Sequence, residues 1–155
     1  MKLIVNPTDS EPITLDTAKE YLQVDGNHDD PLLSRLIKAS RQYIETVCGI
    51  SIIEKQIELE THDFDSPYLL PYGPVKSATV LQVDGSDVEL TGDYVHNSGS
   101  VLIAEYTTGY DTLPEDLETA IIEVLKIYYD ARGTNTEIPV FLQHKLNLYS
   151  RNLYI

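Results

Sequence analysis

The sequence predicts an α+β protein, an antiparallel bundle of about four helices with an inserted antiparallel β-sheet of about five strands. Apolar residues recur at helical spacing toward both ends of the chain and at alternate positions in its middle. No internal repeat is visible, and 155 residues fit one domain. We therefore expect a single domain over residues 1–155, with a β insertion over about 51–108 and helices over about 14–22, 31–48, 114–132 and 140–152.

Two helices are expected before the β insertion. Thr14 is suited to accept a hydrogen bond at the N-cap of the first. Asp30 and Pro31 start the second, because proline lacks the N–H that is unpaired at a first helical position. Gly49 follows its last apolar residue and is the residue type that most often ends a helix.

After Gly49, apolar residues recur at every second position, as they do in β-strands. IEKQIELE alternates as a half-exposed strand does, and VKSATVLQVDGSDVEL predicts two strands around a turn at Asp84 and Gly85. SVLIAEYTT is apolar on both faces, which places it inside the sheet or under a helix. SPYLLPYGPV has too many prolines for a central strand, so it is an extended crossing segment or an edge.

The third helix has a start signal and a stop signal in the sequence. Pro114 suits its first position, and Glu115 and Asp116 place negative charge at the positive end of the helix dipole. Arg132 lies near its other end, and Gly133 is the expected stop.

The apolar surface of this helix is unusually broad. One face is formed by residues at the spacing of a buried stripe, namely Leu117, Ala120, Ile121, Val124, Leu125 and Tyr128. Ile122, Ile127, Tyr129 and Ala131 widen the apolar arc to roughly 220°, well beyond that of an ordinary surface helix. Either the rest of the chain wraps this helix, or part of the arc meets another subunit.

A last helix is expected to start at Pro139, after the polar linker GTNTE. Its apolar stripe consists of Leu142, Leu146, Tyr149 and Leu153. A helix of about 15 residues is marginal in water unless one face is buried. The stripe therefore packs on its own domain or waits for a partner, and the linker favours a partner.

Composition excludes several classes of protein. The formal charge is −14, and eleven acidic residues against Lys55 and Lys76 give −9 between Gly49 and Thr112. This acidity argues against tight DNA binding, which depends on basic side chains. We expect no membrane span and no signal peptide, since the apolar patch in MKLIVNPTDSEP ends at Asn6 and Pro7. A single cysteine, Cys48, excludes an internal disulfide and favours a reducing site of synthesis.

Candidate chemical sites are weak, and we predict no catalytic, cofactor-binding or metal-binding residue. DGNHDD spaces Asp25, Asn27 and Asp29 as a calcium loop does, but Asp30 and Leu36 replace the required glycine and glutamate. His62 with Asp63 and Asp65 lacks a second histidine or cysteine at ligand spacing. Cys48 lies at a helix C-terminus among apolar neighbours, as an unreactive packed thiol does.

Three segments in order carry a family resemblance. They are ITLDTAKEYLQVDGNHDDPLLSRLIKASRQYIETVCG, LPYGPVKSATVLQVDG and YTTGYDTLPEDLETAIIEVLKIYYDARG. Together they resemble the tailed-phage head–tail connector family, the gp-six-like adaptor or head completion proteins. The likeness runs from about Ile13 to Arg151.

The resemblance implies a structural virion protein and no enzyme. Such proteins are made in the bacterial host cytoplasm and assemble as rings, commonly of about a dozen copies, beneath the portal protein at the capsid vertex of the virion. They extend the DNA channel toward a downstream head-completion or tail protein. We therefore expect Ile122, Ile127 and Tyr129 at a subunit interface, and a docking tail for the portal or a neighbouring subunit built on Leu142, Leu146, Tyr149 and Leu153.

Two alternatives belong to other classes. An acidic α+β domain with eleven tyrosines also fits a small ligand- or carbohydrate-binding module, because tyrosine is common at contact surfaces. A metal-dependent hydrolase would use Asp84, Asp87 and Glu89. Ring formation distinguishes the connector from both.

Overall fold

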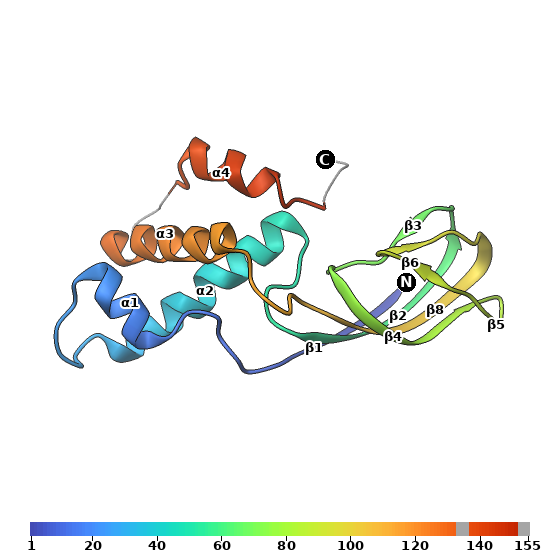
Figure 1. The fold of residues 1–155 in the computed structure, drawn as a ribbon, viewed down its shortest axis with the longest axis horizontal. Coiled ribbons are helices and arrows are strands. Elements are labelled where there is room, and N and C mark those ends of the chain that lie inside the picture. The colour runs from blue at the N-terminus through green and yellow to red at the C-terminus, as the bar shows by residue number, and fades with distance from the viewer. Residues whose placement is uncertain (133–136, 152–155) are drawn as a thin grey trace. The chain divides into compact units, whose positions relative to one another are not determined.

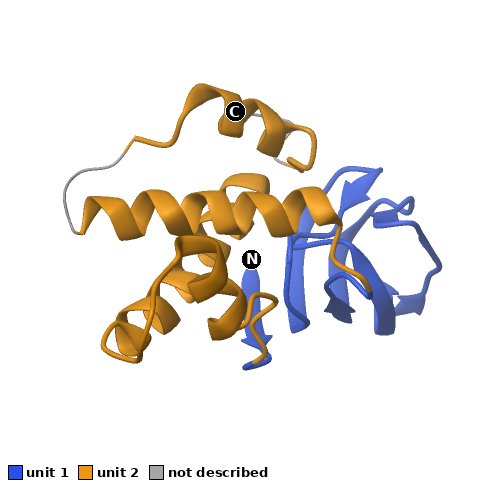
Figure 2. Ribbon diagram, turned by 60° about the vertical axis from the view of Figure 1, so that its left-hand side comes forward, with its two compact units in different colours: residues 1–9, 50–111 blue, residues 10–49, 112–155 orange. Residues whose placement is uncertain are grey.

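The computed structural model describes residues 1–132 and 137–151 of the chain. The chain forms two compact units, one made of Met1–Asp9 and Ile50–Asp111 and the other of Ser10–Gly49 and Thr112–Ile155 (Figure 2). The first unit holds the strands and the second holds the helices (Figures 1 and 2). The predicted α+β class is therefore confirmed, whereas the single domain over residues 1–155 stays a prediction.

Four helices make up the second unit, with bounds close to those expected. They are α1 (Leu15–Leu22), α2 (Asp30–Cys48), α3 (Glu115–Ala131) and α4 (Val140–Asn147). The Thr14 hydroxyl accepts the Thr17 N–H at 3.1 Å, which confirms the predicted cap. α2 ends at Gly49, whose φ of 68° is the left-handed conformation that glycine adopts without strain.

Four helix ends differ from the sequence-based expectation. Pro114 occupies the N-cap position of α3 and not its first helical position, because its ψ of 135° is extended. α2 begins one residue early, so that Asp29 and not Asp30 occupies its N-cap position. α3 ends at Ala131, with Arg132 in the left-handed region at φ 42°, and the expected stop Gly133 lies outside the described residues. α4 ends at Asn147 and not near 152, because the chain tightens there into turns in which the N–H groups of residues 148–150 donate three residues back.

The helical unit has a continuous apolar core, since α2 and α3 pack along their lengths and α4 packs on both (Figure 1). A buried ion-pair network borders this core. The Arg41 guanidinium donates to both Glu11 carboxylate oxygens, at 2.7 and 2.9 Å, and to the Glu45 carboxylate at 2.6 Å. The bidentate pair fixes the chain before α1 to the side of α2.

The strand unit is organised around a five-stranded antiparallel sheet with the order β1-β2-β8-β4-β5. These strands are β1 (Lys2–Pro7), β2 (Lys55–Phe64), β8 (Gly99–Thr108), β4 (Val75–Val83) and β5 (Ser86–Asp87). β8 lies between β2 and β4, as its apolar sequence predicted. The β4–β5 turn is at Asp84 and Gly85, also as predicted, and both adopt positive φ.

A second sheet of three short strands, with the order β3-β7-β6, covers the apolar face of the first. Its strands are β3 (Tyr68–Leu69), β6 (Leu90–Thr91) and β7 (Tyr94–Val95). The proline-rich segment supplies β3 at the edge of this sheet, which agrees with the sequence-based assignment. The core between the sheets includes Ile57, Leu59, Leu70, Val95, Leu102 and Tyr106.

One strand of the five-stranded sheet was missed. The apolar patch near the start of the chain forms β1, which pairs with β2 over six residues from Lys2 opposite Glu60 to Pro7 opposite Lys55. Its short length and terminal proline suit an edge strand. The β region is therefore not purely an insertion between helices, because the first residues of the chain complete its sheet.

Candidate assembly surfaces

The broad apolar arc of α3 divides into a buried face and a half-buried shoulder. The buried face is fully inside the helical unit and consists of Leu117, Ala120, Ile121, Val124 and Leu125. Ile122, Ile127 and Tyr129, the residues expected at a subunit interface, are half-buried. The unit therefore covers only part of the arc, and the shoulder still presents apolar surface.

Tyr129 has a structural contact that sequence spacing could not reveal. Its hydroxyl donates to the Asp29 carboxylate at 2.7 Å, and the Arg132 guanidinium lies over its ring, 5.3 Å from the centroid. The hydrogen bond to Asp29 raises the pKa of Tyr129 above its ordinary value. Asp29 occupies the N-cap position of α2 and makes no side-chain cap bond there. The ring is thus held in one place at the end of α3.

The apolar stripe predicted on the last helix faces inward. Leu142 and Leu146 are completely buried in the helical unit, and the buried Cys48 thiol donates to the Leu146 carbonyl at 3.4 Å. Beyond the helix, the Arg151 N–H donates to the Cys48 carbonyl at 2.7 Å. Tyr149 is half-buried, and Leu153 lies outside the described residues. Leu142 and Leu146 are consequently core residues of the subunit and are not available to a docking partner.

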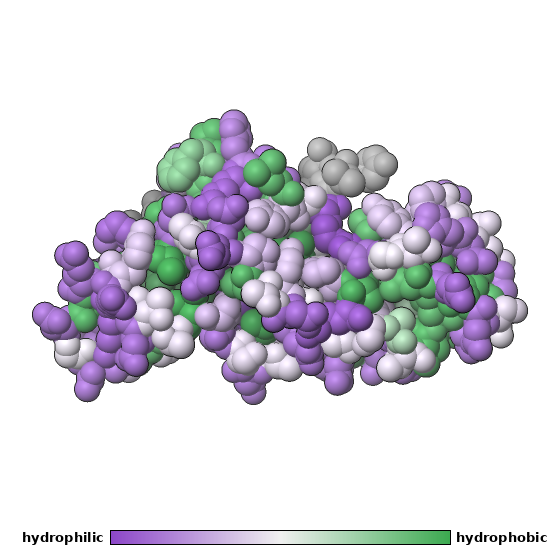
Figure 3. Space-filling model, in the orientation of Figure 1, coloured by the Kyte–Doolittle hydropathy of each residue, from purple (hydrophilic) through white to green (hydrophobic). Residues whose placement is uncertain are grey.

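The opposite face of α4 carries the exposed apolar residues. Val140, Phe141 and Leu148 are 64%, 65% and 84% exposed. Figure 3 shows apolar residues gathered on the surface over α4. The sequence-based prediction selected the inner stripe because helical spacing marks an apolar face without telling which face the fold covers.

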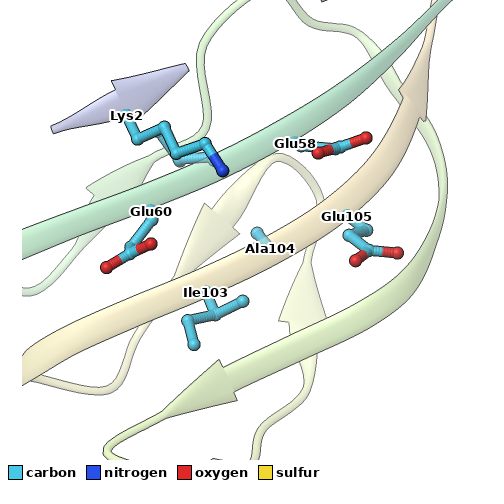
Figure 4. Close-up of a pocket in the computed structure, with 7 residues that line it drawn as sticks. Lys2, Glu58, Glu60, Ile103, Ala104 and Glu105 are labelled. Atoms are coloured by element: carbon cyan, nitrogen blue, oxygen red, sulfur yellow. The ribbon is translucent and has the colours of Figure 1, made fainter. Parts of the chain in front are cut away.

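The uncovered face of the five-stranded sheet is acidic at its centre. Glu58 on β2 lies directly opposite Glu105 on β8, and Glu60 lies between Lys2 on β1 and Ile103 on β8. These side chains surround a shallow hollow of about 130 Å³ (Figure 4). Like charges directly opposite each other destabilise a sheet, so this face has not been optimised for stability alone.

The residues considered for metal chemistry have other contacts. Asn27 accepts a hydrogen bond from Lys19 at 3.0 Å, and the exposed His62 lies 3.2 Å from Glu60. Asp84 accepts the backbone N–H groups of Ser100 and Val101, at 3.0 and 2.8 Å, and therefore ties the β4–β5 turn to the start of β8. Within residues 1–132 and 137–151, no group of three or more His, Cys, Asp or Glu side chains is arranged to hold a metal ion.

Burial raises the pKa of the Cys48 thiol to about 11, as expected for a packed cysteine. No helix in the described part of the chain is long and apolar enough to cross a membrane.

Comparison with known protein families gives one decisive result. The family model described as head completion protein matches residues 11–139. The chain belongs to the head completion protein family. The match covers most of both compact units, and it confirms the resemblance drawn from the three sequence segments. The carbohydrate-binding alternative is therefore not favoured.

Solved structures share the fold of this head completion protein at low sequence identity. A chain in the neck of an empty GTA particle, computed with C6 symmetry, matches with a TM-score of 0.72 and 17% identity over 95% of each chain. A chain in the virion of a native gene transfer agent particle gives a TM-score of 0.71 and 20% identity, over 98% of this chain and 97% of that one. A chain in the neck of a native GTA particle, computed with C12 symmetry, gives 0.65 and 19% over 95% and 94%. Comparison with curated protein sequences gives no match.

Proposed function

We propose that this head completion protein is a structural component of a phage-type virion neck, a head–tail connector that lies between the portal and the tail. The observation that carries the proposal is the family match over residues 11–139. The fold supports it, because chains from the necks of GTA particles share it over nearly their whole length. The role is non-enzymatic, and it resides in surfaces that bind other proteins.

The connector acts as a ring of about a dozen subunits. The matched neck structures were computed with C6 and C12 symmetry, in which identical copies surround a common rotation axis. A subunit of a closed ring needs two different contact faces, one for each neighbour. The half-buried shoulder of α3, formed by Ile122, Ile127 and Tyr129, supplies one of these faces. Tyr129 suits this position because its contacts with Asp29 and Arg132 hold its ring before a neighbour binds.

The outer face of α4 binds the portal. Val140, Phe141 and Leu148 provide exposed apolar area beside the half-buried Tyr149. The inner residues Leu142 and Leu146 hold the helix on its own subunit and so present this outer face to the partner. Docking therefore needs no unfolding of α4.

The acidic sheet face serves a channel that DNA must pass. Glu58, Glu60 and Glu105 cluster on one exposed surface, in a segment with a charge of −9. Such a surface repels the phosphates of DNA and does not hold the DNA in the channel. Tight DNA binding is accordingly not part of this function.

Matched variants on one helix test the ring. Ile122→Glu and Ile127→Glu place charge on the half-buried shoulder, whereas Ile121→Ala and Val124→Ala shorten fully buried side chains. The shoulder variants should keep most of their thermal stability and fail to form rings on portal-containing heads, as judged by electron microscopy. The core variants should lose roughly 2 to 5 kcal/mol of unfolding free energy. Shoulder variants that melt normally and still form rings would show that this face is not an interface.

A further inference from the structure

Both long edges of the five-stranded sheet carry unpaired backbone. β1 is the outermost strand on one side, and among the described residues it pairs only with β2. The Thr8 N–H donates to the Glu54 carbonyl at 2.9 Å, and bonded residues alternate along an antiparallel strand. Leu3 and Val5 therefore direct their N–H and C=O groups away from β2, toward the open edge.

The opposite edge is open along the middle of β4. β5 covers only Gln82 and Val83, and the Val88 N–H donates to the Leu81 carbonyl at 3.0 Å. At the other end of the strand, the Asp93 carboxylate accepts the Val75 N–H at 2.8 Å. Between these bonds, the stretch from Lys76 to Val80 pairs with β8 on one side, and in the part of the chain that the structure describes no strand lies along its other side. Ser77, Ala78 and Thr79 are exposed there.

A groove marks the same edge. Ala78–Gln82 and Asp87–Leu90 line an open groove of about 520 Å³ where the β4–β5 hairpin separates. The pairing of β4 with β8 shifts register twice, between Val75 and Ser77 and between Ala78 and Val80. Such irregularities limit the length over which another strand can pair continuously with this edge.

We propose that β1 of one subunit pairs with the open edge of β4 in the next subunit, so that the sheets join head to tail around the ring. This inference rests on the proposed ring. Strand direction supports it. β1, β2, β8 and β4 alternate in direction, so β1 is antiparallel to β4. A neighbour related by the small rotation of a large ring keeps its strand directions. Its β1 then continues the antiparallel sheet beside β4.

Charge fixes the relative orientation of the two strands at this joint between β1 and β4. In the antiparallel arrangement, the beginning of β1 lies beside the end of β4. Lys2 is the only ionisable side chain of β1, and the groove at the end of β4 carries the exposed acids Asp87 and Glu89. The two edges are therefore complementary to each other and not to themselves. Such edges join copies head to tail, which closes into a ring when the rotation between neighbours allows it, and they do not form a symmetric dimer.

Disulfide cross-linking in assembled particles tests the joint. Ile4→Cys is combined in turn with Ser77→Cys, Ala78→Cys and Thr79→Cys, all on exposed strand positions. Disulfides form when the two Cα atoms lie within about 4.4 to 6.8 Å. The native Cys48 contributes little background, because it is buried and its pKa is raised to about 11. Ile4→Cys with Ile103→Cys is the matched control, because Ile103 is exposed on the same face but belongs to the inner strand β8.

At least one β1–β4 pair should give a ladder of dimers, trimers and higher multiples on a non-reducing gel, while the single cysteines and the control pair give none. Dimers alone would show edge pairing about a two-fold axis and overturn the head-to-tail joint. Rings seen by electron microscopy without any ladder would overturn the joint and leave the connector function intact. The absence of rings would overturn both.

Discussion

The two faces of α4 should separate subunit stability from portal binding. Leu146→Ala removes three carbons from a completely buried side chain, which at about 0.8 kcal/mol per buried CH₂ gives roughly 2.4 kcal/mol before any cavity is counted. The cavity that remains raises the expected cost to about 3 kcal/mol or more. For a chain of this length, that loss lowers the melting temperature by roughly 6 to 12 °C. Phe141→Ser changes a side chain that is 65% exposed, so its cost should stay within about 0.5 kcal/mol.

Thermal melts followed by far-UV circular dichroism measure the first effect, and co-sedimentation with portal-containing heads measures the second. Leu146→Ala should melt early, whereas Phe141→Ser should melt like the native protein and bind heads weakly. Hydrogen exchange in the free subunit should also find the α4 amides protected. An unchanged melting temperature for Leu146→Ala would refute the assignment of α4 to the subunit core. Normal head binding by Phe141→Ser would refute docking through the outer face.

Three further outcomes follow from the structure. Arg41→Ala should lower the unfolding free energy measured in urea by about 3 to 5 kcal/mol. Arg41 and Glu45 are 3% and 6% exposed, so the variant leaves a buried carboxylate without its cation. Arg35→Ala is the control on the same helix, and an equal loss in both variants would contradict this role of Arg41. Burial raises the pKa of Cys48 from 9.0 to about 11, so its contribution to stability is complete below pH 9 and is lost as the pH rises toward 11. Cys48→Ala should therefore show a shallower fall of stability than the native protein between these pH values. The purified protein should not shift duplex DNA in a gel at physiological salt and micromolar concentration, and a salt-sensitive shift would contradict the repulsive role of the acidic face.

Local sequence signals recovered most of the elements. Thr14, Gly49 and the Asp84–Gly85 turn have side-chain or backbone properties that act within a few residues, and the structure uses each of them as predicted. β8 was expected inside the sheet or under a helix because the run Val101–Ala104 makes it apolar on both faces. The α+β class followed from these elements.

The remaining features depend on contacts between distant residues. β1 was missed because six residues at an edge carry little periodicity, and their pairing with β2 spans about fifty positions. The choice between the two faces of α4 has the same limit. Its inner stripe was correctly read as apolar, but only the packing on α2 and α3 shows that Leu142 and Leu146 are already covered. The Tyr129–Asp29 bond joins residues 100 positions apart and has no local signature.

Electron cryo-microscopy of portal-containing heads incubated with the purified protein is the most direct test of the connector. We expect a closed ring of this chain on the portal vertex, with the α3 shoulder at the boundary between subunits and the outer face of α4 against the portal. Heads whose portal vertex stays bare at saturating protein, while the protein remains folded in solution, would contradict it.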